Sequence, residues 1–442
     1  MLVDKITLQD IGLYDTNECI GLITHLNFCK TNGGKAQLDE YLLQPLSSIA
    51  AIEQRQEAIK FYIEKMEFLE AMKITNGTTL VIEKFFESDY KRIPTQISLP
   101  AAYWYQWLSA ADYSLLRYSL EHLVLFYHQL QQWVLVFETN KQNPLLEQLV
   151  EKIKKYTQHP SLKNLPTVAQ LNNPQTVLSL CHFFLYHYKN NTRQLLSHFY
   201  ELDAYYSMAM ASTKYDFVFP TWIESKQPIF EVSAAMHPLV SNAISNNLSL
   251  HPDKNLLFLT GANMAGKSTF IKTIGIVLYL AHIGIGVPAS KMQLSFFDGL
   301  ITNLTTTDNV VKGESYFYNE VQRIKNTIIK ILDGKKYFVL IDELFKGTNI
   351  QDAMKCSSAV IEGLQKLRSS LCILSTHLYE ISEGLQEHPN IQFSFFETTV
   401  HHKELVFHYQ LKEGVSQDRL GYLILEKEGV VQLLDSINKT KY

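Results

Sequence analysis

Residues 261–268, with the sequence GANMAGKS, constrain the fold of this chain more than any other stretch. They match the pattern G-x4-G-K-[ST], in which the glycines let the backbone curl so that its N–H groups point at phosphates. The apolar run LLFLT precedes this loop, and the helix-like segment STFIKTIGIVLYLA follows it. A strand, this loop and a helix in that order predict a phosphate-binding P-loop and argue against a chance glycine loop.

The P-loop pattern assigns a role to two side chains. Lys267 should reach the β- and γ-phosphates of ATP, and Ser268 should ligate Mg²⁺ beside the positive end of the following helix. We expect Lys267 to face solvent when no nucleotide is bound, so that its replacement weakens binding without unfolding the chain. The predicted nucleotide-binding residues are Gly261, Asn263, Met264, Ala265, Gly266, Lys267, Ser268 and Thr269.

Two further apolar runs end in groups that suit ATP hydrolysis. The run YFVLI leads into Asp342 and Glu343, as in a Walker B strand. Asp342 is expected to hold Mg²⁺, directly or through water, and Glu343 to polarise the attacking water. The run LCILST leads into His377, which can touch the γ-phosphate or that water. Carboxylates and histidines at strand ends are common structural features, but behind a P-loop they predict a hydrolytic site.

The segment GESYFYNEV, at residues 313–321, lies between these motifs. Gly313 and Ser315 open an amphipathic helix, so Ser315 stands at a helix N-terminus, where a phosphate can bind. Ordinary capping of that helix by Ser315 is the alternative.

The character of the sequence changes near residue 215. Before it, apolar residues recur at helical spacing over residues 1–90, 101–138 and 175–212, with breaks at prolines. After it, short apolar runs alternate with helix-like segments, which is typical of a parallel sheet with crossover helices. We therefore predict an all-α helical domain over residues 1–214, followed by an α/β P-loop NTPase domain with a mostly parallel sheet over residues 215–442.

Composition narrows the class of partner and the compartment. With a net charge of −4 the chain is no strongly cationic nucleic-acid binder, so any nucleic-acid contact must come from local patches. The apolar runs are too short for a membrane span, and MLVDKITLQD does not have the pattern of a signal peptide. Five scattered cysteines fit reduced thiols. We expect a cytoplasmic protein that does not bind a membrane.

Taken together, the motifs resemble those of the MutS family of mismatch-repair ATPases, which are relatives of the ABC ATPases. TGANMAGKST is similar to the family's P-loop, GESYFYNEV to its signature helix, LIDELFKGTNIQDA to its Walker B segment and STHLYEI to its histidine switch. TNGGKAQLDEYLLQPLSSIAAIEQRQEAI and ELDAYYSMA resemble the start and the end of its helical core, or lever, domain.

This resemblance implies an ATPase that works as a homodimer and engages double-stranded DNA with helical arms, in mismatch repair or a related process. It also implies that Ser315 acts in trans. Each site would take Ser315 from one subunit and the remaining residues from the other, namely Lys267, Ser268, Asp342, Glu343 and His377. The family's mismatch-recognition and connector domains precede the core, and we expect this chain to lack them and to show no strong mismatch preference.

Two other functions stay open at this point. One is a ribosome- or RNA-associated, ATP-gated switch without repair activity, because the charge of the chain does not distinguish DNA from RNA. The other is a P-loop kinase, against which the signature serine, the histidine switch and the long helical arms argue. The chain also departs from the family pattern, because Tyr316, Tyr318 and Lys346 stand where threonine, methionine and arginine are usual.

Overall fold

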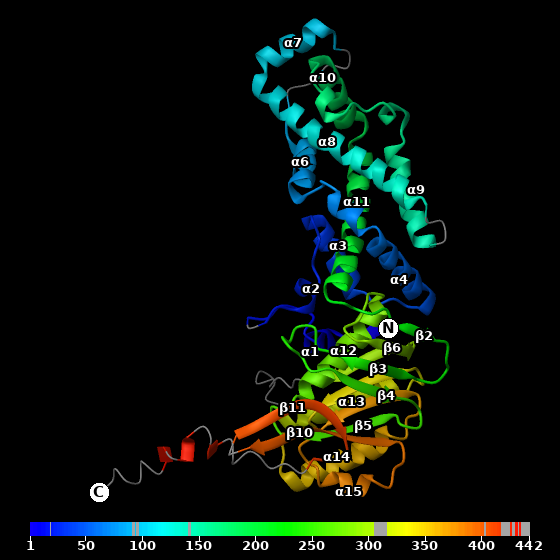
Figure 1. Ribbon diagram of the computed structural model, residues 1–442, viewed down its shortest axis with the longest axis vertical. Helices are drawn as coiled ribbons and strands as arrows, with labels where there is room; N and C mark the ends of the chain where they lie inside the picture. The colour runs from blue at the N-terminus through cyan, green and yellow to red at the C-terminus, as the bar shows by residue number, and fades with distance from the viewer. Residues whose placement is uncertain are drawn as a thin grey trace, which may run out of the picture. The chain divides into compact units, whose positions relative to one another are not determined.

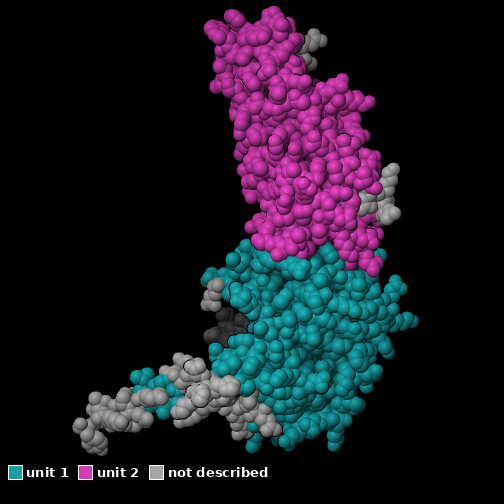
Figure 2. All heavy atoms as spheres, in the orientation of Figure 1, with its two compact units in different colours: residues 1–25, 45–52, 215–442 teal, residues 26–44, 53–214 magenta. Residues whose placement is uncertain are grey.

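The chain folds into two compact units (Figure 2). One unit comprises residues 26–44 and 53–214, and the other comprises residues 1–25, 45–52 and 215–442. The computed structural model describes residues 1–17, 19–90, 93, 97–139, 143–304, 316–401, 404–416, 425–426, 429–431 and 433–434. Within these residues, none of the helices combines the length and the apolar character that crossing a bilayer requires.

The first unit is helical, as predicted (Figure 1). Its longest helices, α8 and α11, carry the most buried side chains, and the rings of Trp133 and Phe137 stack at 4.2 Å within α8. The elements of this unit are α3 (Asn32–Leu43), most of α4 (Ile49–Glu64), α5 (Met66–Ala71), α6 (Asn76–Glu87), α7 (Leu99–Leu108), α8 (Ala110–Phe137), α9 (Pro144–Thr157), η1 (Pro160–Leu162), η2 (Val168–Gln170), α10 (Pro174–His182), η3 (Phe183–His187) and α11 (Lys189–Lys214).

Two predicted helices are interrupted in the structure. The helical region expected over residues 101–138 consists of two helices, because Ser109 leaves helical geometry with φ −128° and ψ 47°. The helix expected over residues 175–212 is broken where a π turn, η3, gives way to Tyr188 at φ −121°. Periodicity alone predicts the apolar face of a helix but not such breaks within it.

The second unit is built on a seven-stranded sheet of order β1-β7-β8-β9-β5-β10-β11, in which only the β10–β11 pair is antiparallel among the described strands. The runs predicted as strands next to the P-loop, Asp342 and His377 form β5, β8 and β9, so a mostly parallel sheet is confirmed. The strands are β1 (Leu2–Val3), β5 (Leu256–Gly261), β7 (Gly299–Asn303), β8 (Tyr337–Asp342), β9 (Ser370–Ser375), β10 (Ile391–His401) and β11 (Glu404–Glu413).

Helices cover both faces of this sheet. On one face, α13 (Tyr316–Ile331), α14 (Ile350–Leu364) and α15 (Ile381–Leu385) pack into a shared core with alternate residues of β5, β8 and β9. On the other face, α12 (Lys267–Ile283) approaches so closely that a Cβ at Gly275 would lie 3.0 Å from Leu340. A smaller mixed sheet of order β2-β6-β3-β4 completes the unit, with β2 (Thr221–Ile223), β3 (Phe230–Ala235), β4 (Asn246–Leu250) and β6 (Lys291–Ser295).

The first 25 residues belong to the sheet unit, which differs from a single division of the chain at residue 214. They include β1, α1 (Lys5–Asp10) and α2 (Leu22–His25). β1 pairs in parallel with β7, and Asp10 accepts hydrogen bonds from Thr302 Oγ1 at 2.7 Å and from Leu304 N at 3.1 Å. The helical spacing of apolar residues in the first 25 residues carries no information about partners so distant in the chain. The pairing of β1 with β7 was therefore not predicted.

Candidate functional site

The loop at residues 261–268 leaves β5 and enters α12 through two glycines with positive φ. Gly261 has φ 136°, and Gly266 has φ 105° at the N-cap of α12. Backbone at these angles favours glycine, because side chains with a Cβ rarely adopt it. The N-cap residue of α12 is Gly266, which has no side chain that could cap the helix. The N–H groups of its first turn therefore offer the donors and the positive potential of an anion site.

Lys267 corrects one expectation from the sequence. It is 5% exposed rather than facing solvent, because its Nζ turns back and donates to the carbonyl oxygens of Gly261 at 2.8 Å and Ala262 at 2.9 Å. Burial lowers the pKa of Lys267, while the carboxylates of Glu343 and Asp342 act in the opposite direction. To bind a phosphate, this ammonium group must exchange the two carbonyl oxygens for phosphate oxygens.

Both predicted carboxylates at the end of β8 have partners. Asp342 accepts a hydrogen bond from Ser375 at the end of β9. Glu343 contacts two side chains, His377 Nε2 through Oε1 at 2.6 Å and the Lys346 ammonium through Oε2 at 2.6 Å. Burial alone would raise the pKa of Glu343, but the hydrogen bonds from His377 and Lys346 outweigh it and lower the pKa to about 2. In this arrangement Glu343 is a weak base.

A cleft of about 520 Å³ opens beside the loop, within the range of small-molecule sites. Of the predicted residues, its lining includes Asn263, Met264, Gly266, Lys267, Ser268, Thr269 and Glu343. Gly261, Ala265, Asp342 and His377 do not line it, and Ser315 lies outside the described residues. The structure thus brings the lysine, the serine and the second carboxylate of the prediction to one surface.

Much of the remaining lining of the cleft was not predicted. It comes from residues 235–246, including His237 and Asn246, and from Tyr409 on β11. Asn246 joins the segment 235–246 to β11, because its side chain donates to Tyr409 O at 3.1 Å and accepts from Leu411 N at 2.7 Å. Burial lowers the pKa of His237 to about 4, so its imidazole is neutral at pH 7. The segment AAMHPLV, at residues 234–240 upstream of the P-loop, is the sequence signal that could have indicated this part of the lining.

Tyr409 gives the cleft an aromatic surface next to the loop. Its backbone has φ 54°, and its ring lies so near Gly266 that a Cβ there would be 3.1 Å from Cδ1. The side chain remains 43% exposed. An exposed ring that borders a phosphate-binding loop offers a face on which a nucleobase can stack.

The oxygen atoms near the loop fit a magnesium ion. Ser268 is exposed at the cleft, and Asp342 supplies a carboxylate at the end of β8, which is separated from β5 by β9. Among the described residues, no cluster of three or more His, Cys, Asp or Glu side chains could hold a metal by itself. Mg²⁺ commonly uses only one or two protein oxygens together with phosphates and waters, so this sparse set is sufficient.

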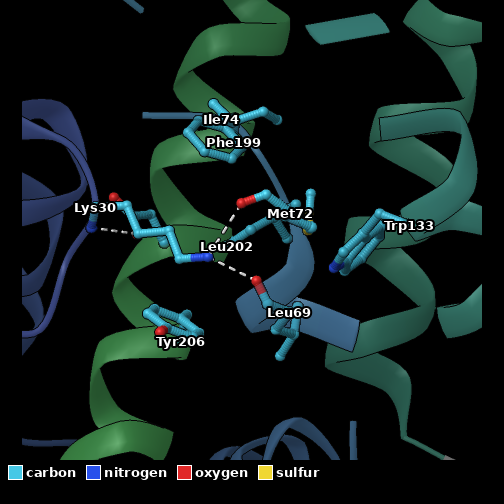
Figure 3. A pocket seen from close by; sticks show the side chains of 9 residues that line it. Lys30, Leu69, Met72, Ile74, Trp133, Phe199, Leu202 and Tyr206 are labelled. Carbon is cyan, nitrogen blue, oxygen red and sulfur yellow. Dashed lines mark hydrogen bonds between the residues drawn. The ribbon is translucent and has the colours of Figure 1, made fainter. Parts of the chain in front are cut away.

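A second hollow lies in the helical unit, and it differs in kind (Figure 3). Its volume is about 20 Å³, enough for a water molecule but not for a nucleotide. Lys30 points into it and donates from Nζ to Leu69 O at 2.7 Å and Met72 O at 3.3 Å. The other lining side chains are mostly apolar, among them Trp133, Phe199 and Leu202. This hollow is therefore part of the helical packing.

Comparison with known proteins places both parts of the chain. Residues 6–209 match the family described as MutS domain III, and residues 257–437 match MutS domain V. The proteins named DNA mismatch repair protein MutS in Petrotoga mobilis, Thermotoga maritima and Bacillus subtilis are 29%, 29% and 30% identical to it over 55%, 52% and 52% of this chain. The aligned parts are only 30%, 29% and 27% of the lengths of those relatives.

Proposed function

Because this chain belongs to the MutS family, we propose that it binds and hydrolyses ATP in the cleft between residues 261–268 and Glu343. The observation that carries the proposal is the shared lining of this cleft by the N-terminus of α12, Lys267, Ser268 and Glu343. These groups supply positive potential, a phosphate-binding cation and a carboxylate for water on one surface.

The residues of the cleft divide the work of hydrolysis among them. The backbone N–H groups of residues 266–269 and the Lys267 ammonium bind and orient the phosphates. Glu343 orients the attacking water, and His377 holds the Glu343 carboxylate from the side opposite Lys346. Tyr409 provides the stacking face for the base. Ser268 and Asp342 would hold Mg²⁺, which neutralises negative charge on the phosphates.

Rearrangement at two points must precede hydrolysis. Lys267 leaves the carbonyl oxygens of Gly261 and Ala262 when it contacts phosphate. Glu343 gives up one of its contacts with His377 and Lys346, because a carboxylate with a pKa of about 2 accepts a proton poorly near neutral pH. ATP binding thereby converts a self-paired polar cluster into an active site.

We further propose that two copies of the chain share each site and that the helical unit is a lever that engages double-stranded DNA. Ser315 from one subunit would complete the phosphate contacts of the other. The relatives' name, DNA mismatch repair protein, and the match to MutS domain III support a DNA substrate.

The shared site is tested by mixing a Lys267→Ala protein with a Ser315→Ala protein, each nearly inactive alone. In a heterodimer one site carries both lesions and the other carries neither, so ATPase activity partly returns if Ser315 acts in trans. A mixture that stays inactive after confirmed subunit exchange contradicts the shared site. If Ser315 only caps its own helix, Ser315→Ala costs about 1 kcal/mol of stability and little activity.

The nucleic-acid partner is tested by crosslinking the Glu343→Ala protein in cells and identifying the nucleic acid recovered. We expect duplex DNA, bound with an affinity that falls steeply as salt rises and with little preference for mismatches. Recovery of ribosomal RNA instead would favour the ribosome-associated switch. A strong mismatch preference that persists at high salt would contradict the expected absence of a base reader.

A further inference from the structure

One buried carboxylate in the sheet unit accepts hydrogen bonds from the loop that follows Glu343. Glu320, on α13, is 7% exposed. Its Oε1 accepts a hydrogen bond from the backbone N–H of Lys346 and its Oε2 accepts one from that of Gly347, each at 3.3 Å. A single side chain therefore fixes two consecutive amides three and four residues after Glu343. Glu320 lies in the segment GESYFYNEV, but it has no role in the nucleotide contacts proposed for the cleft.

The loop formed by residues 343–347 has an unusual backbone conformation. Glu343 has φ 59° and Phe345 has φ 57°, and neither residue is a glycine. Bulky residues hold such angles only where the surroundings enforce them, and these positions cluster at functional sites. Among the described residues, the enforcing contacts are a hydrogen bond from Glu343 N to Ser375 O at 3.1 Å and the packing of the Phe345 ring against Phe317 on α13 at 5.7 Å. Glu320 adds the only bidentate contact among them.

The loop geometry sets the environment of the Glu343 carboxylate. Lys346, whose backbone Glu320 holds, reaches back with Nζ to Glu343 Oε2 at 2.6 Å. A shift of the Lys346 backbone would move this ammonium group and the strained turn from which the Glu343 side chain projects. The position of the carboxylate therefore depends on Glu320, although Glu320 does not itself line the nucleotide cleft.

We propose that Glu320 is a positioning residue for hydrolysis, which holds residues 343–347 so that Glu343 meets the attacking water at the correct angle. The inference rests on the proposed ATPase function. It also gives α13 a mechanical role, because both Glu320 and Phe317 tie this helix to the loop. A displacement of α13 would therefore also change the geometry of Glu343.

The test compares Glu320→Gln with the parent chain. The substitution keeps the shape, but the side-chain amide has one acceptor oxygen, and its NH2 group faces a backbone N–H that also donates. Glu362→Gln on the exposed face of α14 controls for the loss of a negative charge, and Ile331→Val in the α13 core controls for weakened packing. Glu320→Asp keeps the charge but is one methylene too short to reach both amides.

Two readouts separate positioning from a merely structural role. Amide hydrogen exchange at residues 346 and 347, measured without nucleotide, should accelerate about 10-fold or more in Glu320→Gln. The kcat for ATP should fall roughly 10- to 100-fold with KM within about threefold of the parent value, because the base is misplaced while the phosphate loop is untouched. The kcat of Glu320→Asp should lie between those of the parent chain and Glu320→Gln. Both controls, Glu362→Gln and Ile331→Val, should retain the parent kcat.

The effect must also depend on Glu343. In a Glu343→Ala background, Glu320→Gln should slow the residual hydrolysis less than twofold, because there is no carboxylate left to position. Unchanged amide exchange, or a parent-like kcat in Glu320→Gln and Glu320→Asp, overturns the inference while the ATPase function stands. A parent chain that neither binds nor hydrolyses ATP overturns the proposed function, and the positioning role with it.

Discussion

Lys30 in the helical unit and Lys267 in the sheet unit use the same interaction in different surroundings. Each is a largely buried lysine that donates to backbone carbonyls, Lys30 to three at the end of α5 and Lys267 to two in the loop before α12. Beside Lys30 lies a hollow of about 20 Å³, whose lining Figure 3 shows. Beside Lys267 lies a cleft of about 520 Å³.

The difference lies in what each lysine can exchange its partners for. Lys30 satisfies carbonyls that a helix end leaves without intrahelical donors, and the space next to it admits no ligand (Figure 3). Of the two residues whose carbonyls Lys267 satisfies, Ala262 lines the open cleft, so water can replace the ammonium there when phosphate binds it. A buried lysine is therefore evidence for a ligand site only together with adjacent volume and a second group that recognises the same ligand.

The largest expected effect comes from Lys267→Met, which removes the ammonium but keeps most of the stem. ATP affinity should fall by about 10²-fold or more, since charged hydrogen bonds contribute about 1.5–3 kcal/mol each. The protein should stay folded, because the cleft lets water reach the freed carbonyls. Titration with a fluorescent ATP analogue and a thermal melt check both statements. Parent-like affinity would contradict the assignment of the loop.

A second effect, on the rate of hydrolysis rather than on ATP affinity, should come from Glu343→Ala. Hydrolysis should slow by roughly 10²- to 10⁴-fold, the usual contribution of a positioned general base, while ATP binding is retained. Single-turnover hydrolysis and equilibrium binding measured side by side separate the two. Glu362→Ala, at an exposed position, is the control. Turnover within a few-fold of the parent rate would mean that Glu343 is not the residue that activates water.

Local sequence predicted the parts of this site that depend on neighbours along the chain. The apolar runs that form β5, β8 and β9 and the glycines at 261 and 266 were recognised because each is a short, contiguous signal. The conformation of the Lys267 side chain was not predicted, because residue types do not show whether a lysine faces solvent or donates to its own loop.

Contacts between distant segments account for what the sequence left unpredicted. Asn246 joins β4 to β11 across 165 residues, and Asp10 joins α1 to β7 across 292 residues. Glu320 meets the Lys346 backbone only because α13 packs beside β8. No local periodicity encodes these pairs, since each depends on the sheet order that brings its elements together.

A smaller effect, on stability alone, is expected in the helical unit from Asp203→Ala. Asp203 is 4% exposed and accepts hydrogen bonds from Lys30 N at 2.9 Å, Thr31 N at 2.9 Å and Thr31 Oγ1 at 2.6 Å, which fixes the start of α3 to α11. Leaving these buried donors unpaired should cost about 3 kcal/mol in the free energy of unfolding. Denaturant melts should show this loss, with ATP affinity of the folded protein unchanged. Glu57→Ala, at an exposed site on α4, should change stability by less than about 0.5 kcal/mol.

The smallest effect should come from Lys30→Met, the same substitution as at Lys267 but in the other setting. It removes the three hydrogen bonds to Leu69, Glu70 and Met72, and the contact of the ammonium with the Tyr206 ring at 4.8 Å. The methionine keeps the apolar stem packed, and the exposed edge of α5 lets water reach the carbonyls, so the loss of stability should be about 1 kcal/mol. Lys35→Met, at an exposed site on α3, controls for the loss of a positive charge. Denaturant melts and ATP titrations of both variants complete the comparison. If Lys30→Met lowers ATP affinity as strongly as Lys267→Met, then volume beside the lysine does not separate structural from ligand-binding lysines in this chain.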